Sequence, residues 1–160
     1  MPVSILFICT GNICRSPMAE ARMRRLVQEA GLSEDILIDS AGTGPWHQGD
    51  RPHRGTLAVL ARHGDPSDGI LARQVHAGDL ERFDYLVVMD SSNARDVRRM
   101  AQRYGADGEV VHLLDFADPA VTDGLSDVPD PYYSGGFERV YELIDSGCKG
   151  LLAHLQKTEL

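Results

Sequence analysis

The sequence predicts an α/β fold in which a four-stranded parallel sheet carries helices on both faces. Short runs of apolar and β-branched residues alternate with longer helical patterns, and this alternation is typical of parallel sheets. With 160 residues, 42% of them hydrophobic and 25% charged, the chain can bury a core of its own. We find no internal repeat and no low-complexity tract. We therefore expect a single domain over residues 1–160.

The first strand is expected at residues 3–8, an apolar and β-branched run that ends in a turn cluster. A helix is expected next, over residues 17–30. Its start is indicated by Ser16, which offers an N-cap hydroxyl, and by Pro17, which suits the first helical position. Its end is indicated by Gly31.

The remaining elements continue the alternation of strands and helices. Strands are recognised by short apolar runs and helices by apolar residues three to four positions apart. In chain order we expect a strand at 36–39, a helix at 53–63, a strand at 85–89, a helix at 92–104, a strand at 110–113 and a helix at 136–155. Residues 115–136 are irregular and acidic, and a loop of this length in a compact domain is usually functional or mobile. In such folds ligands bind at the carboxyl ends of the strands.

The stretch between the first strand and the first helix has the layout of a phosphate cradle that holds its own nucleophile. Cys9 and Arg15 have five residues between them, enough for the backbone amides to curl around one tetrahedral anion. Gly11 and Asn12 tolerate the unusual dihedral angles of such a curl. The helix start attracts anions, and the planar guanidinium of Arg15 suits two phosphate oxygens. The same positive field favours the thiolate form of Cys9 at neutral pH.

Charge and cysteine content argue against several classes of function. The net charge of −8 disfavours nucleic acid as a partner. No apolar run approaches the ~20 residues of a membrane span, and the chain does not begin with a basic and apolar leader. The three cysteines lack the spacing of a metal site or a disulfide framework. We expect a cytoplasmic protein with no metal, no cofactor and no membrane partner.

The cradle and four later motifs resemble the low-molecular-weight protein tyrosine phosphatase family. The later motifs are Asp39-Ser40-Ala41-Gly42-Thr43 with Trp46-His47, Ala72-Arg73-Gln74, Phe83-Asp84-Tyr85 with Met89-Asp90, and Asp130-Pro131-Tyr132-Tyr133. The resemblance implies a single phosphatase domain over residues 1–160 with the flavodoxin-like strand order 2-1-3-4. It implies hydrolysis of protein phosphotyrosine through a cysteinyl-phosphate intermediate. Phosphotyrosine-containing proteins are the implied partners, and inorganic phosphate, vanadate or similar oxyanions are the implied inhibitors.

Cleavage of a phosphate ester needs a proton for the leaving oxygen, and a carboxylic acid in a partly desolvated cleft can supply it. The acidic loop holds five candidates that the residues alone do not separate: Asp115, Asp118, Asp123, Asp127 and Asp130. The resemblance selects Asp130, whose backbone is restricted to extended conformations by Pro131. Because Cys9 must be ionised while Asp130 is protonated, we expect a bell-shaped pH profile with an acidic optimum.

The resemblance also assigns roles to the other site residues. Cys9 is the implied nucleophile, Arg15 the phosphate-binding group and Ser16 the hydroxyl that supports the leaving thiolate. Ser40 and Asp90 match supporting positions near the loop. The implied substrate contacts are Thr10, Gly11, Asn12, Ile13, Cys14, Trp46, Tyr132 and Tyr133.

Particular residues refine what the resemblance implies. Relatives that act on phosphoarginine carry threonine where this chain has Ile13, so Ile13 favours phosphotyrosine. Cys14 matches a cysteine that traps the oxidised nucleophile as a reversible disulfide, and a buried inert thiol is the alternative. Many eukaryotic relatives hold a histidine just before the Ala-Arg-Gln motif that bonds the loop asparagine. Residues 69–71 supply none here, and we expect Ser40 to bond Asn12 instead.

Two other activities use a similar loop. An arsenate reductase-like enzyme needs two further cysteines on a mobile segment, and the matching residues 69–89 contain none. A non-catalytic phosphotyrosine-binding or redox-sensing module would not need Cys9, Arg15 and a candidate acid together. Hydrolysis is therefore the favoured activity.

The helix expected at residues 92–104 carries a run of arginines at spacings of three and four, which places them on one face. A solvated surface is the favoured interpretation, and a docking site for an acidic partner is the alternative. The arginines are Arg95, Arg98, Arg99 and Arg103.

Overall fold

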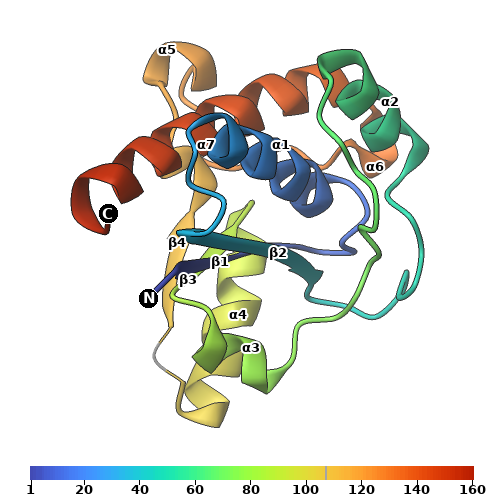
Figure 1. Ribbon diagram of the computed structural model, residues 1–160. Coiled ribbons are helices and arrows are strands. Elements are labelled where there is room, and N and C mark those ends of the chain that lie inside the picture. The colour runs from blue at the N-terminus through green and yellow to red at the C-terminus, as the bar shows by residue number, and fades with distance from the viewer. Residues whose placement is uncertain (107) are drawn as a thin grey trace.

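In the part of the chain that the structure describes, four parallel strands form one sheet in the order β2-β1-β3-β4 (Figure 1). The computed structural model describes residues 1–106 and 108–160. The strands are β1 (Val3–Cys9), β2 (Ile36–Gly42), β3 (Tyr85–Val88) and β4 (Glu109–His112). The longer helices are α1 (Arg15–Glu29), α2 (Arg54–His63), α4 (Ser91–Tyr104) and α7 (Phe137–Thr158). The predicted fold class, parallel sheet and strand order are confirmed.

Helices cover both faces of the sheet, and each face has its own core. Ile5 and Phe7 of β1 belong to a cluster built with residues of α1 and α7. Leu6 and Ile8 belong to a second cluster with residues of α4. Figure 1 shows α1, α2 and α7 above the sheet and α3 (Ala77–Arg82) with α4 below it. Successive side chains of a strand point to opposite faces, so a strand covered on both sides is apolar throughout.

The position of β1 in the sheet explains where a ligand can bind. β1 pairs with β2 on one side and with β3 on the other. Its last residue, Cys9, lies opposite Gly42, the last residue of β2. Where connections leave neighbouring parallel strands in opposite directions, a crevice forms outside their carboxyl ends. The loop after Cys9 opens into this crevice.

Every predicted strand and helix is present, and the differences lie in where some of them begin or end. β2 continues to Gly42 rather than to residue 39, because its end pairs with Cys9 and forms a bridge with Gln74. Four short helical segments of the described residues were not predicted: α3, η1 (Leu113–Phe116), α5 (Pro119–Thr122) and α6 (Pro131–Ser134). Leu113, expected to end the fourth strand, is the first residue of η1. Among the described residues, no helix is both long and apolar enough to cross a membrane.

The prediction that Ser16 caps the first helix is wrong. α1 begins at Arg15, and its N-cap is Cys14, which makes no side-chain cap bond. Cys14 already has φ −113° and ψ −79°, so the tight loop enters the helix two residues earlier than Pro17. Ser16 is fully buried in the first turn, and its Oγ lies 2.9 Å from Cys9 Sγ. The Ser16 hydroxyl, which was expected to cap the helix, therefore contacts loop residues instead.

Candidate active site

The loop between β1 and α1 is a tight curl held against the end of β2. Asn12 has φ 58°, in the left-handed region that asparagine tolerates better than most residues. An added Cβ at Gly42 would lie 2.8 Å from the carbonyl oxygen of Thr10, so only glycine permits this approach. Thr43 N donates to Cys9 O at 2.9 Å and continues the contact. The shape of the loop thus depends on β2 as well as on its own sequence.

One pocket of about 300 Å³ opens at the loop and gathers most of the predicted site residues. It is lined by Cys9, Thr10, Gly11, Ile13, Cys14, Arg15, Trp46, His47, Asp130, Tyr132 and Tyr133. Asn12, a predicted substrate contact, is not among these residues, because its side chain is 1% exposed and points into a supporting network. Any contact of Asn12 with a bound anion would come from its backbone.

A larger hollow of about 950 Å³ lies along α1 and α7, away from this loop. None of the predicted site residues lines it. Its charged side chains pair with one another, as in the contact of Arg22 Nε with Asp145 Oδ1 at 2.8 Å. The smaller pocket is therefore the candidate active site.

Arg15 is held rigidly while one edge of its guanidinium is left available. Its Nη1 donates to Asp90 Oδ2 at 2.7 Å and to Val128 O at 2.9 Å. Its Nε is buried and has no hydrogen-bond partner among the described residues. Burial alone would lower the pKa of Arg15, but the charges of Cys9 and Asp90 raise it above its ordinary value. A permanent cation with an unmatched buried donor suits an anionic ligand.

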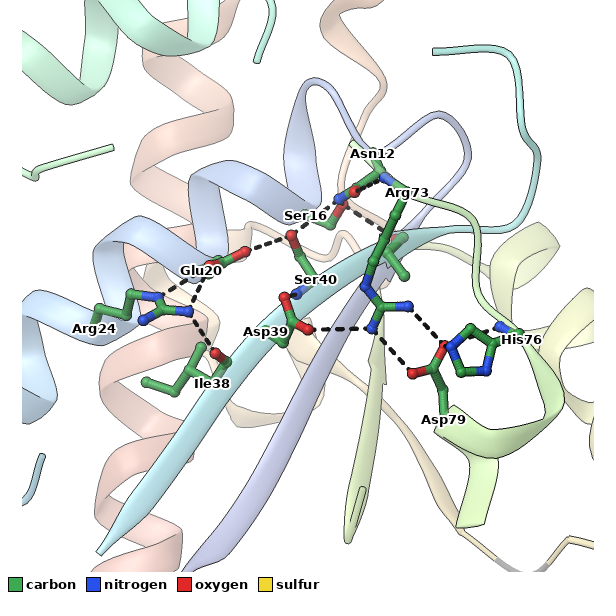
Figure 2. A network of polar contacts seen from close by, with 11 residues as sticks. Asn12, Ser16, Glu20, Arg24, Ile38, Asp39, Ser40, Arg73, His76 and Asp79 are labelled. Carbon is green, nitrogen blue, oxygen red and sulfur yellow. Dashed lines mark hydrogen bonds and ion pairs between the residues drawn. The ribbon is translucent and has the colours of Figure 1, made fainter. Parts of the chain in front are cut away.

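A chain of hydrogen bonds runs from the Cys9 sulfur to the loop asparagine. Ser16 Oγ lies 2.9 Å from Cys9 Sγ and accepts from Asn12 Nδ2 at 2.7 Å. Asn12 Nδ2 also donates to Ser40 Oγ at 3.0 Å, and the predicted bond between these two side chains is confirmed. Ser40 in turn donates to Glu20 Oε1 at 2.6 Å (Figure 2). Ser40 thus orients the Asn12 amide, and the buried Glu20 carboxyl holds Ser40 in turn.

The structure separates the five candidate aspartates, since Asp130 lines the pocket and the other four do not. Asp130 is the N-cap of α6, where its Oδ1 accepts from Tyr132 N at 3.0 Å. Its backbone is extended, with φ −85° and ψ 113°. Its Oδ2 lies 3.7 Å from Arg15 Nη2, and its side chain is 37% exposed. The carboxyl therefore faces the cradle at the mouth of the pocket.

Aromatic side chains form the rim of the pocket. Trp46 is 68% exposed and Tyr133 is 87% exposed. The rings of Tyr132 and Tyr133 meet edge to face at 4.8 Å, and His47 lies 5.9 Å from Tyr132. Exposed aromatic faces around a deep anion site can hold a flat ring. Ile13 adds a buried apolar contact at the same pocket.

Cys14 differs in character from the pocket groups around it. Its thiol is buried and unpaired. Burial, together with the nearby charges of Cys9 and Asp130, raises the pKa of Cys14 to about 12. Cys14 is thus a neutral thiol over the ordinary range of pH.

Several residues of the site carry only a weak mark in the sequence, or none. His47 lines the pocket, and only its place beside Trp46 in a family motif marks it. Asn93 Nδ2 donates to Thr10 Oγ1 at 3.3 Å, and its spacing of three from Asp90 is a capping-box signal. Glu20 is the buried end of the Ser40 bond. No sequence pattern could have pointed to the Val128 carbonyl that accepts from Arg15, because every residue has a backbone carbonyl.

Comparison with known proteins agrees with this site. A family model described as low molecular weight phosphotyrosine protein phosphatase matches residues 4–160. The low molecular weight protein-tyrosine-phosphatase YfkJ of Bacillus subtilis is 50% identical over 155 residues, 97% of each chain. A low molecular weight protein-tyrosine-phosphatase of Streptomyces coelicolor is 46% identical over 159 residues, 98% of this chain and 96% of the other.

Solved structures give the same result. The crystal structure of YfkJ has a TM-score of 0.93 at 48% identity and covers 100% of this chain and 98% of its own. A structure described as drosophila arginine phosphatase has a TM-score of 0.87 at 32% identity, covering 97% and 99%. The fold and pocket thus define an α/β enzyme with a tight loop and a pocket at the switch point of its sheet. The chain belongs to the low-molecular-weight protein tyrosine phosphatase family.

Proposed function

We propose that the protein hydrolyses phosphotyrosine in proteins through a cysteinyl-phosphate intermediate. The observation that carries this proposal is one pocket lined by Cys9, Arg15 and Asp130, in which Arg15 Nε has no partner among the described residues. A phosphoryl group in the cradle would accept from the Nε and Nη2 edge of Arg15 and from the loop amides.

In the first step the thiolate of Cys9 attacks phosphorus in line with the tyrosyl oxygen. The S–P bond forms, the P–O bond to tyrosine breaks, and the proton of Asp130 passes to the leaving oxygen. Arg15 holds the equatorial oxygens as their charge spreads in a loose transition state. The position of Asp130 Oδ2 near Arg15 Nη2, at 3.7 Å, supports this assignment.

In the second step water attacks the cysteinyl phosphate. Asp130, now a carboxylate, takes a proton from the water, and the S–P bond breaks to release inorganic phosphate. Ser16 Oγ, 2.9 Å from the sulfur, donates a hydrogen bond to the departing thiolate and keeps its proton. The thiolate and the protonated acid are then restored for another cycle.

The aromatic rim and Ile13 support phosphotyrosine as the substrate class. Trp46, Tyr132 and Tyr133 present ring surface at the pocket mouth, and Ile13 is buried beside the nucleophile loop. Inorganic phosphate and vanadate should compete for the cradle. We place the enzyme in the cytoplasm, because a reducing compartment keeps a catalytic thiol such as Cys9 free.

Hydrolysis of para-nitrophenyl phosphate and of a phosphotyrosine peptide tests the proposal. We expect no turnover by Cys9→Ser and a loss of about 10²–10⁴-fold in kcat for Asp130→Ala, with a flattened alkaline limb of the pH profile. Asp127→Ala is the matched control, since Asp127 lies in the same acidic stretch but not in the pocket. Tight phosphate binding without turnover in the wild type would favour a binding module, and faster hydrolysis of a phosphoarginine peptide would overturn the substrate class.

A further inference from the structure

The side chain of Arg73 connects two separate carboxylates beside the phosphate loop (Figure 2). Its Nη1 and Nη2 donate to the two oxygens of Asp79 at 2.9 and 3.0 Å. Its Nη2 also donates to Asp39 Oδ2 at 3.2 Å. The Asp79 side chain is 1% exposed and also accepts from His76 N at 2.9 Å, so it is an anchored carboxylate. A two-pronged contact of this kind fixes the guanidinium in direction as well as in distance.

The backbone of the same residue touches the loop. Arg73 N donates to Asn12 Oδ1 at 3.0 Å, and Arg73 O accepts from Gly42 N at 2.8 Å. Residue 73 lies in the segment between α2 and α3. The only regular structure in this described segment is the bridge of Gln74 with Gly42. Backbone bonds of Gly42 with Arg73 and with Val75 hold this segment beside β2, and the ion pairs of the Arg73 side chain are a second anchor for the N–H of residue 73.

Asn12 is the residue that this N–H holds. Its carbonyl accepts from Arg73 N, while its amide donates to Ser16 Oγ at 2.7 Å and to Ser40 Oγ at 3.0 Å. These bonds set which way the Asn12 side chain points, although its backbone is in the left-handed region at φ 58°. Ser16 then faces Cys9 Sγ at 2.9 Å. A displacement of residue 73 would pass through Asn12 to the hydroxyl beside the nucleophile.

We propose that Arg73 is a positioning residue for catalysis. Its ion pairs with Asp79 and Asp39 hold the N–H of residue 73 against Asn12, and this contact keeps the phosphate loop in its anion-binding shape. The inference rests on the proposed function only for its kinetic readout, since phosphate binding can be measured without turnover.

The experiment is a double-mutant cycle between Arg73→Met and Asn12→Ala, with Arg73→Lys as the conservative variant. We expect Arg73→Met to lower kcat/KM for para-nitrophenyl phosphate and to weaken competitive inhibition by phosphate, each by roughly tenfold or more. In the Asn12→Ala background the further loss from Arg73→Met should be less than about twofold, because coupled groups are not additive. Arg73→Lys should recover part of the loss.

Arg139→Met is the control, because Arg139 on α7 is likewise an arginine with two partners, the Glu142 carboxylate and the Val121 carbonyl, but neither partner lies at the loop. It should leave the kinetics unchanged. Assays are run well below the melting temperature of each variant, and Asp39→Asn, which removes the more exposed of the two carboxylate contacts, serves if Arg73→Met does not fold.

Calorimetric titration of phosphate into Cys9→Ser with and without Arg73→Met separates this inference from the proposed function. Weaker phosphate binding in the double variant supports positioning by Arg73 even if the wild type shows no turnover. Unchanged phosphate affinity, or losses in kcat/KM that add fully with Asn12→Ala, would show that Arg73 contributes only to stability.

Discussion

The hydroxyl of Ser16 lies 2.9 Å from the sulfur of Cys9, although the two residues belong to different secondary structure elements. Ser16 is in the first turn of α1 and Cys9 is the last residue of β1. The same hydroxyl accepts from Asn12 Nδ2, so its own hydrogen can point at the sulfur or at Ala41 O, which lies 3.4 Å away. In the proposed mechanism a hydrogen bond from this hydroxyl would stabilise the sulfur both when it attacks and when it leaves.

Ser16→Ala should therefore impair the second chemical step more than substrate binding. We expect kcat to fall roughly 10- to 100-fold with little change in KM, since a hydrogen bond to a charged group contributes about 1.5–3 kcal/mol. Slower breakdown of the intermediate should give a burst of para-nitrophenol in rapid mixing. Ser92→Ala, at an exposed serine of α4, is the control. A larger effect on KM than on kcat would contradict this role.

Asp90→Ala should release the guanidinium of Arg15. Asp90 accepts from Arg15 Nη1 at 2.7 Å and also caps α4 through Asn93 N. We expect phosphate to inhibit about 10- to 100-fold less well, and the loss of the cap to destabilise the fold by about 0.5–2 kcal/mol.

Asp118→Ala separates these two effects of Asp90→Ala. Asp118 caps α5 in the same way, through Ala120 N, but lies outside the pocket. This variant should lose stability and keep its affinity for phosphate. If both variants weaken inhibition equally, the role of Asp90 is helix capping alone. Inhibition constants and urea unfolding give the two measurements.

Glu20→Gln should change how stability depends on pH. Burial raises the pKa of Glu20, and the hydrogen bonds from Ser40 and Arg24 only partly oppose it. The folded protein thus holds this proton more tightly than the unfolded chain. The stabilisation is fully present below the unfolded pKa, about 4.5, and is lost as pH rises through the folded pKa.

Glutamine removes this titration, so the unfolding free energy of Glu20→Gln relative to wild type should rise from pH 4.5 towards pH 7.5. Each unit of pKa shift corresponds to about 1.36 kcal/mol. Urea unfolding at four pH values in this range measures the difference. Glu29→Gln is the control, because Glu29 is 56% exposed on the same helix. A difference that stays constant with pH would contradict the prediction.

Cys14→Ser should impair recovery from oxidation. Peroxide converts a reactive thiolate to a sulfenic acid, and a neighbouring thiol can trap it as a disulfide. The pKa of Cys14, raised to about 12, means that its thiolate fraction grows about tenfold per pH unit below that value, so trapping should speed up with pH.

The measurement is the activity that dithiothreitol restores after peroxide treatment. Wild type should regain most of its activity and Cys14→Ser several-fold less. Cys148→Ala is the control, since Cys148 is fully buried in α7 and contacts Ala19 O. Equal recovery in all three proteins would show that Cys14 does not trap the oxidised nucleophile.

Much of this protein is determined by local sequence patterns. The apolar runs and helix signals predict the strands and long helices seen in the described residues, because buried strands are apolar throughout and helices repeat apolar residues every three to four positions. The spacing of Cys9 and Arg15 predicts the loop for a similar reason, since its residues are neighbours in the chain.

Only the tertiary structure decides which distant groups meet at that loop. Asp130 is separated from four similar aspartates by its place at the pocket, and Ser16 serves the sulfur rather than the helix end. The hold of Asp90 and the Val128 carbonyl on Arg15 and the contact of Arg73 with Asn12 join segments far apart in the chain. Such contacts depend on how strands and helices pack together, and no local sequence pattern predicts them.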